Sequence, residues 1–125
     1  MQAVDIDVDD VLDAYITAAL WSTTDDNDEP LDENYAASDL APETLERMRA
    51  DVVSFVEKHA SEIAAWEGDD AAKQAGHDLW FTRCGHGVGF WESEWGRPGE
   101  ILDSYAKSIG EVWLYVGNDE KIYIA

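Results

Sequence analysis

Residues 78–84 read DLWFTRC, residues 85–87 read GHG and residues 88–93 read VGFWES. Whether this segment is extended or helical determines the class of the fold. Two short runs of aromatic and other apolar residues, separated by a glycine-rich tripeptide, are typical of a β-hairpin. The pattern therefore predicts two antiparallel strands, at residues 78–84 and 88–93.

The residues that follow predict a helix and a second hairpin. Pro98 and Gly99 open a helical pattern that Gly110 ends. Residues 112–116 (VWLYV) and 121–124 (KIYI) flank a four-residue turn, which favours two more strands.

The N-terminal part predicts two helices joined by a long polar connection. One of the first aspartates can cap a helix that runs to about Trp21, because apolar residues recur there at helical spacing. The connection at residues 22–38 is acidic and unusually long. A second helix is expected from Pro42, at its first turn, to Gly68.

Together these elements predict an α+β fold. An antiparallel sheet of about four strands, formed by the two hairpins, would pack with two N-terminal helices and with one helix between the hairpins. The 125 residues fit a single domain, residues 1–125. Within it, residues 1–75 are expected to form an acidic helical part and residues 76–125 a ββαββ part.

Charge is the most unusual property of the composition. The chain has 28 acidic and 8 basic residues and a formal net charge of −20 at pH 7, and its first 46 residues contain 14 acidic residues and no Lys or Arg. A field this negative repels nucleic acid and anionic membranes and attracts basic protein surfaces. Because a high net charge also keeps proteins soluble, attraction of a basic partner and solubility are both open interpretations.

The sequence predicts a cytoplasmic protein. Cys84 is the single cysteine and cannot form an internal disulfide. The acidic N-terminus does not resemble a signal peptide, and no apolar run has the length needed to span a bilayer.

Three residues suggest a metal site. His77, Cys84 and His86 have side chains that bind zinc, and a hairpin would bring them together. Their spacing matches no closed zinc pattern, however, and the N-terminal aspartates lack the glycine and glutamate of a calcium-binding loop. We therefore expect no metal, no cofactor and no enzymatic activity, and a zinc hydrolase at these three residues is the alternative.

Residues 75–91 (AGHDLWFTRCGHGVGFW) resemble a segment, AGHDFWLTRNGHGAGFWD, of small acidic proteins encoded by bacteriophages and prophages. The resemblance extends to residues 21–25, 31–35, 41–45 and 114–119. It implies a phage origin and a location in the cytoplasm of the host cell.

The run FWESEWG places two carboxylates and a hydroxyl among aromatic rings. In the expected strand, Glu92 and Glu94 would share one face roughly 6.5 Å apart, about the spacing of neighbouring phosphates along a DNA strand. Ser93 would hydrogen-bond between them, while Trp91 and Trp95 would anchor the segment or contact a partner. The Glu-Ser pair is also similar to the edge-strand motif of uracil-DNA glycosylase inhibitors.

These observations predict a phage protein that mimics DNA and occupies the basic DNA-binding groove of a host DNA-processing enzyme. Uracil-DNA glycosylase is the most specific target that the Glu-Ser resemblance implies. The alternatives are an anti-restriction or anti-CRISPR protein, which would block a groove of the same kind, and a phage structural or regulatory binding module that does not mimic DNA. We expect no direct binding of nucleic acid or membrane. The sequence leaves the target and the oligomeric state open.

Overall fold

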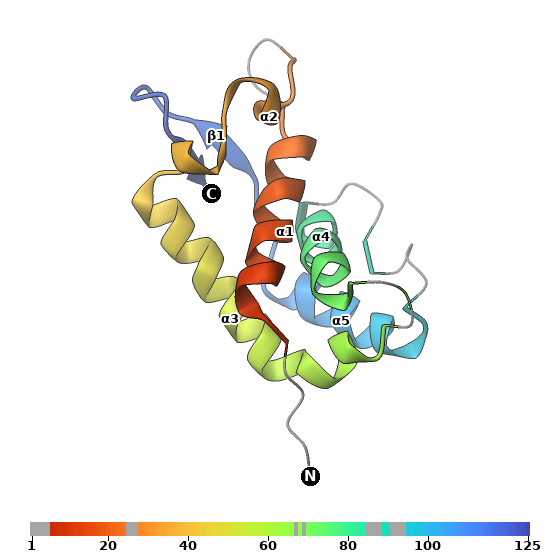
Figure 1. The fold of residues 1–125 in the computed structure, drawn as a ribbon. Coiled ribbons are helices and arrows are strands. Elements are labelled where there is room, and N and C mark those ends of the chain that lie inside the picture. Colours follow the sequence, from red (N-terminus) through yellow and green to blue (C-terminus); the bar gives the residue numbers. More distant parts are fainter. Residues whose placement is uncertain (1–5, 25–27, 67, 69, 85–88, 91–94) are drawn as a thin grey trace.

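The fold is mostly helical, with one small β-hairpin near the C-terminal end (Figure 1). The computed structural model describes residues 6–24, 28–66, 68, 70–84, 89–90 and 95–125. In chain order the elements are α1 (Val8–Ser22), α2 (Leu31–Asn34), the 3₁₀ helix η1 (Ala37–Asp39), α3 (Pro42–Ala64), α4 (Ala71–Cys84), α5 (Arg97–Ser108), β1 (Leu114–Val116) and β2 (Ile122–Ile124).

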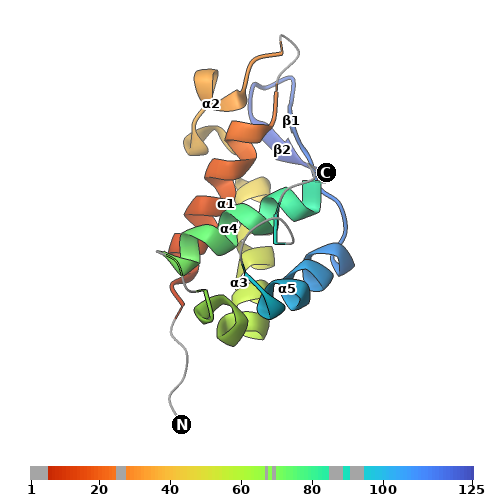
Figure 2. The same ribbon diagram turned by 90° about the vertical axis from the view of Figure 1, so that its right-hand side faces the viewer.

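Four helices form the body of the molecule. α1 packs against α3 and α4, and α5 packs against the same two helices. The hairpin and α2 lie together at one end of this helical group, and the start of α1 lies toward the other (Figures 1 and 2).

The predicted α+β fold with a four-stranded sheet is wrong. Residues 78–84 form the second half of α4 rather than a strand, and the sheet consists of β1 and β2. Of the other predicted strand, residues 88–93, the structure describes Gly89 and Phe90, which lie in a bend and a turn. The helical packing that replaces the first hairpin therefore changes the class of the fold.

The burial pattern of α4 explains why this segment is helical. Ala75, Gly76, Leu79, Trp80 and Arg83 are buried, and they recur at intervals of three and four residues, which is the spacing of one helix face. The alanine-rich residues that open α4 also favour a helix. Packing of this face thus overrides the preference of aromatic residues for strands.

A close approach of α1 and α4 depends on a glycine. A Cβ atom added to Gly76 would overlap the carbonyl oxygen of Val11 and would lie 2.8 Å from the Cβ atom of Ala14. Ala14 is itself buried in α1. Small residues on both helices therefore set the short distance between their backbones.

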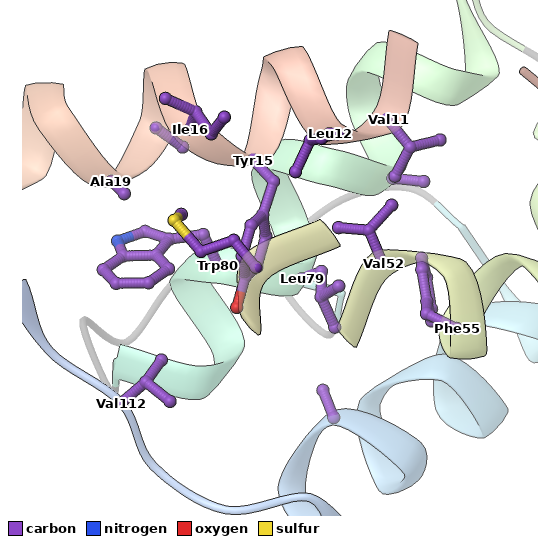
Figure 3. Packing of buried hydrophobic residues seen from close by; sticks show 14 of the residues in the cluster. Val11, Leu12, Tyr15, Ile16, Ala19, Val52, Phe55, Leu79, Trp80 and Val112 are labelled. Carbon is purple, nitrogen blue, oxygen red and sulfur yellow. The ribbon is translucent and has the colours of Figure 1, made fainter. Parts of the chain in front are cut away.

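Aromatic rings fill the core between these helices (Figure 3). The rings of Tyr15 and Trp80 meet edge to face, with centroids 5.4 Å apart and planes at 83°. The indole Nε1 of Trp80 donates a hydrogen bond to Ser22 Oγ at 2.9 Å, so its polar atom is satisfied inside the protein. Phe55 of α3 and Val112, which precedes β1, complete this core from the other side.

Arg83 carries a buried guanidinium that joins four segments. Its Nη1 atom donates to the hydroxyl of Tyr15 at 2.9 Å and to the carboxylate of Asp51 at 2.8 Å, on α1 and α3. Nε and Nη2 donate to the carbonyl oxygens of Gly110 and Ile109, at 3.0 and 3.2 Å, where α5 ends. The Arg83 side chain is only 2 % exposed. Burial raises the pKa of Tyr15 to about 12, so its hydroxyl stays neutral and can accept this bond.

The C-terminal hairpin lies where the sequence predicts it and is tied to the start of α3. Its register pairs Leu114 with Ile124, Tyr115 with Tyr123 and Val116 with Ile122. The carbonyl oxygen of Ile122 accepts hydrogen bonds from Ala41 N and from the buried Thr44 Oγ1, both at 2.9 Å. These two bonds fix β2 against the first turn of α3.

The remaining predicted elements differ from the structure mainly at their ends. α1 and α5 lie where they are expected, and Asp7 caps α1 by accepting a hydrogen bond from Asp9 N at 2.9 Å. The helix that begins at Pro42 ends at Ala64, before the predicted end at Gly68. The long connection contains α2, because the buried Leu31 docks this short helix on the core.

Replacing Gly76 by Ala should lower the free energy of unfolding by about 1–3 kcal/mol, because the new methyl group would force α1 and α4 apart. The direction of this change distinguishes a crowded site from an exposed one, because at an exposed helix position the same substitution would raise the free energy of unfolding by about 1 kcal/mol. Chemical denaturation measures the change. Ser104→Ala, at an exposed position of α5, is the control and should change stability by less than about 0.5 kcal/mol. A Gly76→Ala variant as stable as the parent protein would contradict the close approach.

Replacing Arg83 by Gln should lower the free energy of unfolding by about 3–5 kcal/mol, because Asp51 and two carbonyl oxygens would lose their donor. Arg49→Gln is the matched control. Arg49 pairs with Asp9 at 3.1 Å but is 53 % exposed, so its loss should cost less than about 1 kcal/mol. Similar losses for the two variants in denaturation experiments would show that Arg83 does not organise the core.

Candidate functional site

Most of the predicted contact segment lies outside the described residues. This applies to Trp91, Glu92, Ser93 and Glu94. Trp95 is described, and it is buried rather than presented at the surface. The strand in which Glu92 and Glu94 would have a phosphate-like spacing therefore lies outside the described residues. The role of these two glutamates stays a prediction.

The described residues on either side of this segment are anchored to α4. Trp95 Nε1 donates to the buried carboxylate of Asp78 at 2.7 Å, and Gln74 Nε2 donates to the same oxygen at 2.8 Å. The backbone N–H of Phe90 donates to Thr82 Oγ1 at 3.2 Å. Of the two roles expected for the rings, anchoring is the one that the burial of Phe90 and Trp95 fits.

The proposed zinc ligands do not converge in the part of the chain that the structure describes. His77 and Cys84 both lie on α4, seven positions apart, which places them roughly 10 Å from each other along the helix axis. His86 is outside the described residues. Among the side chains that are described, no group of three or more His, Cys, Asp or Glu residues is arranged to hold a metal ion.

Carboxylates gather instead at the N-terminal end of α1. Each of these residues is exposed, and we call the group the α1 acidic cluster: Asp7, Asp9, Asp10, Asp13 and Asp70. The charges of the other four members, that of Asp7 most strongly, raise the pKa of Asp10, with a contribution from partial desolvation. The fold thus holds like charges close enough to repel one another.

Two helix N-termini support this cluster. Asp7 caps α1, and Asp70 caps α4 by accepting a hydrogen bond from Lys73 N at 3.1 Å. A helix N-terminus carries a partial positive charge, which offsets part of the repulsion between nearby carboxylates. The local sequence thus places aspartates at positions where two helix dipoles stabilise them.

A shallow hollow of about 330 Å³ lies beside the cluster, between α1 and the start of α4. It is lined by Asp10, Asp13, Ala14, Thr17, Asp70, Lys73 and His77. Partial burial, together with the charge of Lys73, lowers the pKa of His77, so the imidazole is mainly neutral at pH 7. His77 therefore does not neutralise the carboxylates around it.

Two basic residues adjoin the cluster and leave most of its charge in place. Arg49 of α3 pairs with Asp9 at 3.1 Å, in an exposed ion pair, and Lys73 lines the hollow. Five carboxylates against these two cations leave a net charge of −3 for these seven residues. The aspartates of α1 are evident in the sequence, but the place of Asp70 is not, because only the packing of α4 on α1 brings Asp70 to them.

The fold and this surface define a small, mostly helical acidic domain with a concentrated negative face. Comparisons of the sequence with protein-family models, with curated proteins and with solved structures find no match. Within the described residues, no helix combines the length and the apolar composition needed to cross a membrane.

Replacing Asp10 by Asn should raise the midpoint of thermal unfolding at pH 7 and low salt. The pKa of Asp10 is above its ordinary value of 3.8 in the folded protein, so the folded state binds this proton more tightly than the unfolded state does. The stability contributed by Asp10 is therefore present below about pH 3.8 and is lost as the pH rises through the folded pKa. The advantage of the variant should disappear in acid and shrink in high salt.

Asp9→Asn is the matched control for this experiment. It removes the same charge from the neighbouring position but breaks the pair with Arg49, so it should not raise the unfolding midpoint. An equal gain for both variants, or a gain independent of salt, would contradict repulsion at Asp10.

Proposed function

We propose that this protein is a phage-encoded, DNA-mimicking inhibitor that occupies the basic DNA-binding groove of a DNA-processing enzyme in the cytoplasm of the host cell. The α1 acidic cluster is the observation that carries the proposal. The fold brings its carboxylates together from two segments that are far apart in the sequence. Dispersed charges would keep the protein equally soluble, so solubility does not require this clustering.

The charge density of the cluster is close to that of DNA. Asp7, Asp9, Asp10 and Asp13 lie within seven consecutive residues, which span roughly 9 Å at 1.5 Å per residue. This corresponds to about one charge per 2 Å, compared with about one per 1.7 Å along double-stranded DNA. A groove lined with Lys and Arg to neutralise phosphates would therefore meet a field of similar strength.

Binding to such a groove would also relieve a repulsion within the free protein. The pKa of Asp10 is raised because nearby carboxylates disfavour its charge. Lys and Arg side chains of a partner would reverse the sign of the local potential and favour all of these charges at once. Because the cluster is exposed, this contact requires no rearrangement of the helical core.

Uracil-DNA glycosylase is the target that we favour, on the resemblance of the Glu-Ser pair to the motif of its inhibitors. Glu92, Ser93 and Glu94 are the proposed direct contacts, with Trp91 beside them and Trp95 as the anchor on α4. Restriction enzymes and CRISPR effectors, whose grooves also bind DNA, are the alternative targets. In this proposal the protein needs no cofactor and catalyses no reaction.

A uracil-excision assay tests the proposal directly. A bacterial glycosylase would be titrated with this protein at two salt concentrations, using a uracil-containing oligonucleotide as the substrate. We expect stoichiometric inhibition that weakens as salt rises. The variant Asp10→Asn/Asp13→Asn/Asp70→Asn should need an inhibitor concentration at least about tenfold higher at low salt, because it loses electrostatic attraction while Asn preserves the cap of α4.

The variant Asp32→Asn/Glu33→Gln/Glu46→Gln is the matched control. It removes the same total charge from exposed positions of α2 and α3 outside the cluster and should inhibit within about threefold of the parent protein. Equal losses for both triple variants would show that only total charge matters.

Glu92→Gln/Glu94→Gln tests the direct contacts in the same assay. No inhibition at any ratio removes the glycosylase, and a failure against restriction and CRISPR enzymes as well would favour a binding module that does not mimic DNA.

A further inference from the structure

One edge of β1, here called its free edge, pairs with no other strand in the part of the chain that the structure describes. Trp113 and Ala125, next to the paired strands, exchange both of their backbone hydrogen bonds. Inward-facing and outward-facing positions alternate along an antiparallel ladder, so the N–H and C=O groups of Leu114 and Val116 point away from β2. Among the described residues, none forms a backbone hydrogen bond with these outward-facing groups.

A cleft of about 510 Å³ follows this free edge. One wall is β1 with the turn after it, and the other is the end of α1 with α2, which lie beside β1 in Figures 1 and 2. The lining residues are Thr23, Thr24, Leu31, Tyr35, Leu114, Tyr115, Val116, Gly117, Asn118 and Glu120. None of them belongs to β2, so the cleft lies on the side of β1 where the unpaired backbone groups are.

The two faces of the hairpin beside this cleft differ in chemistry. Trp113 and Tyr115 are 56 % and 49 % exposed on the outer face, and Tyr115 stacks on Tyr123 with ring centroids 5.7 Å apart. On the inner face, the buried Leu31 and Leu114 form the floor of the cleft, and polar residues such as Thr23 and Asn118 line the rest of it. An added strand would therefore meet aromatic rings with every second side chain and the mostly polar lining of the cleft with the others.

The negative charge beside the cleft favours a basic partner. The exposed carboxylate of Glu120 lines the cleft, and the exposed Asp119 lies next to it in the turn. Exposed aromatic faces attract Lys and Arg through their π electrons. A second copy of this chain would bring its own net charge of −20 to the same surface and would be repelled.

We infer that the free edge of β1 binds an extended segment of a basic partner protein, with Lys or Arg at every second position, as an additional strand. Main-chain hydrogen bonds to Leu114 and Val116 supply affinity, and the two hairpin faces supply specificity. The cleft lies beyond the C-terminal end of α1, whereas the α1 acidic cluster lies at its N-terminal end. The inference therefore goes beyond the proposed function and does not rest on it.

Amide hydrogen exchange followed by NMR tests this inference on the whole chain. The probe is a short synthetic peptide in which Lys alternates with Val. At saturation we expect exchange of the Leu114 and Val116 amides to slow by at least about tenfold, because both become hydrogen-bonded. No binding, or binding that perturbs the α1 acidic cluster without protecting these two amides, would overturn the inference. A peptide of alternating Glu and Val is the charge control and should not bind.

Variants on both sides of the cleft make the test specific. Val116→Pro removes an outward-facing donor and should weaken peptide binding by at least about tenfold, in line with the loss of one or two hydrogen bonds. Because proline can disturb the hairpin, Glu120→Lys provides a second test at an exposed position. It should weaken binding several-fold more than Glu111→Lys, which makes the same charge change outside the cleft. Equal binding by the two lysine variants would mean that the peptide is held by general charge, and the inference would fail.

A final comparison separates this surface from the proposed DNA-mimicking site. The variant Asp10→Asn/Asp13→Asn/Asp70→Asn should still protect the Leu114 and Val116 amides when the peptide is added. Loss of protection in this variant would place peptide binding at the acidic cluster and would contradict a separate site on β1.

Discussion

Hydrogen bonding by the buried guanidinium of Arg83 is the interaction on which the rest of the structure depends. From α4 the guanidinium donates through Nη1 to α1 and α3, and through Nε and Nη2 to the end of α5. A buried cation is tolerated only when its hydrogen bonds are made, so the helices must take the positions that satisfy it. Arg83 is one of only 8 basic residues in the chain, and it is used inside the core rather than at the surface.

The elements that could be predicted from the sequence are those with local signals. α1 has an aspartate cap and helical periodicity, α3 and α5 have proline near their first turns, and the C-terminal hairpin has two apolar runs around a turn. α4 lacks such a signal in its second half, where aromatic residues favour a strand. Its helical state is decided by packing of one face against α1, where Gly76 allows the close approach, and the partner helix cannot be identified from the local sequence.

The surface features were only partly predictable for the same reason. The negative charge of the first helix is evident from the sequence, but the approach of Asp70 follows from how α4 packs. From the sequence, Trp95 is expected either to anchor its segment or to contact a partner, and in the structure its indole reaches the buried carboxylate of Asp78, 17 positions earlier. The free edge of β1 depends equally on three-dimensional context, because it exists only where no other described strand completes the sheet.

The hydrogen bond from Thr44 to the carbonyl of Ile122 has a consequence for the order of folding. It joins residues 78 positions apart and closes the core around the start of α3. Contacts between such distant residues form late, because the entropy lost in closing a long loop must be overcome first. During synthesis the N-terminal helices therefore emerge long before β2 can cover them. The 14 acidic residues in the first 46 repel neighbouring nascent chains in that interval, so the charge asymmetry also protects an incomplete core from aggregation.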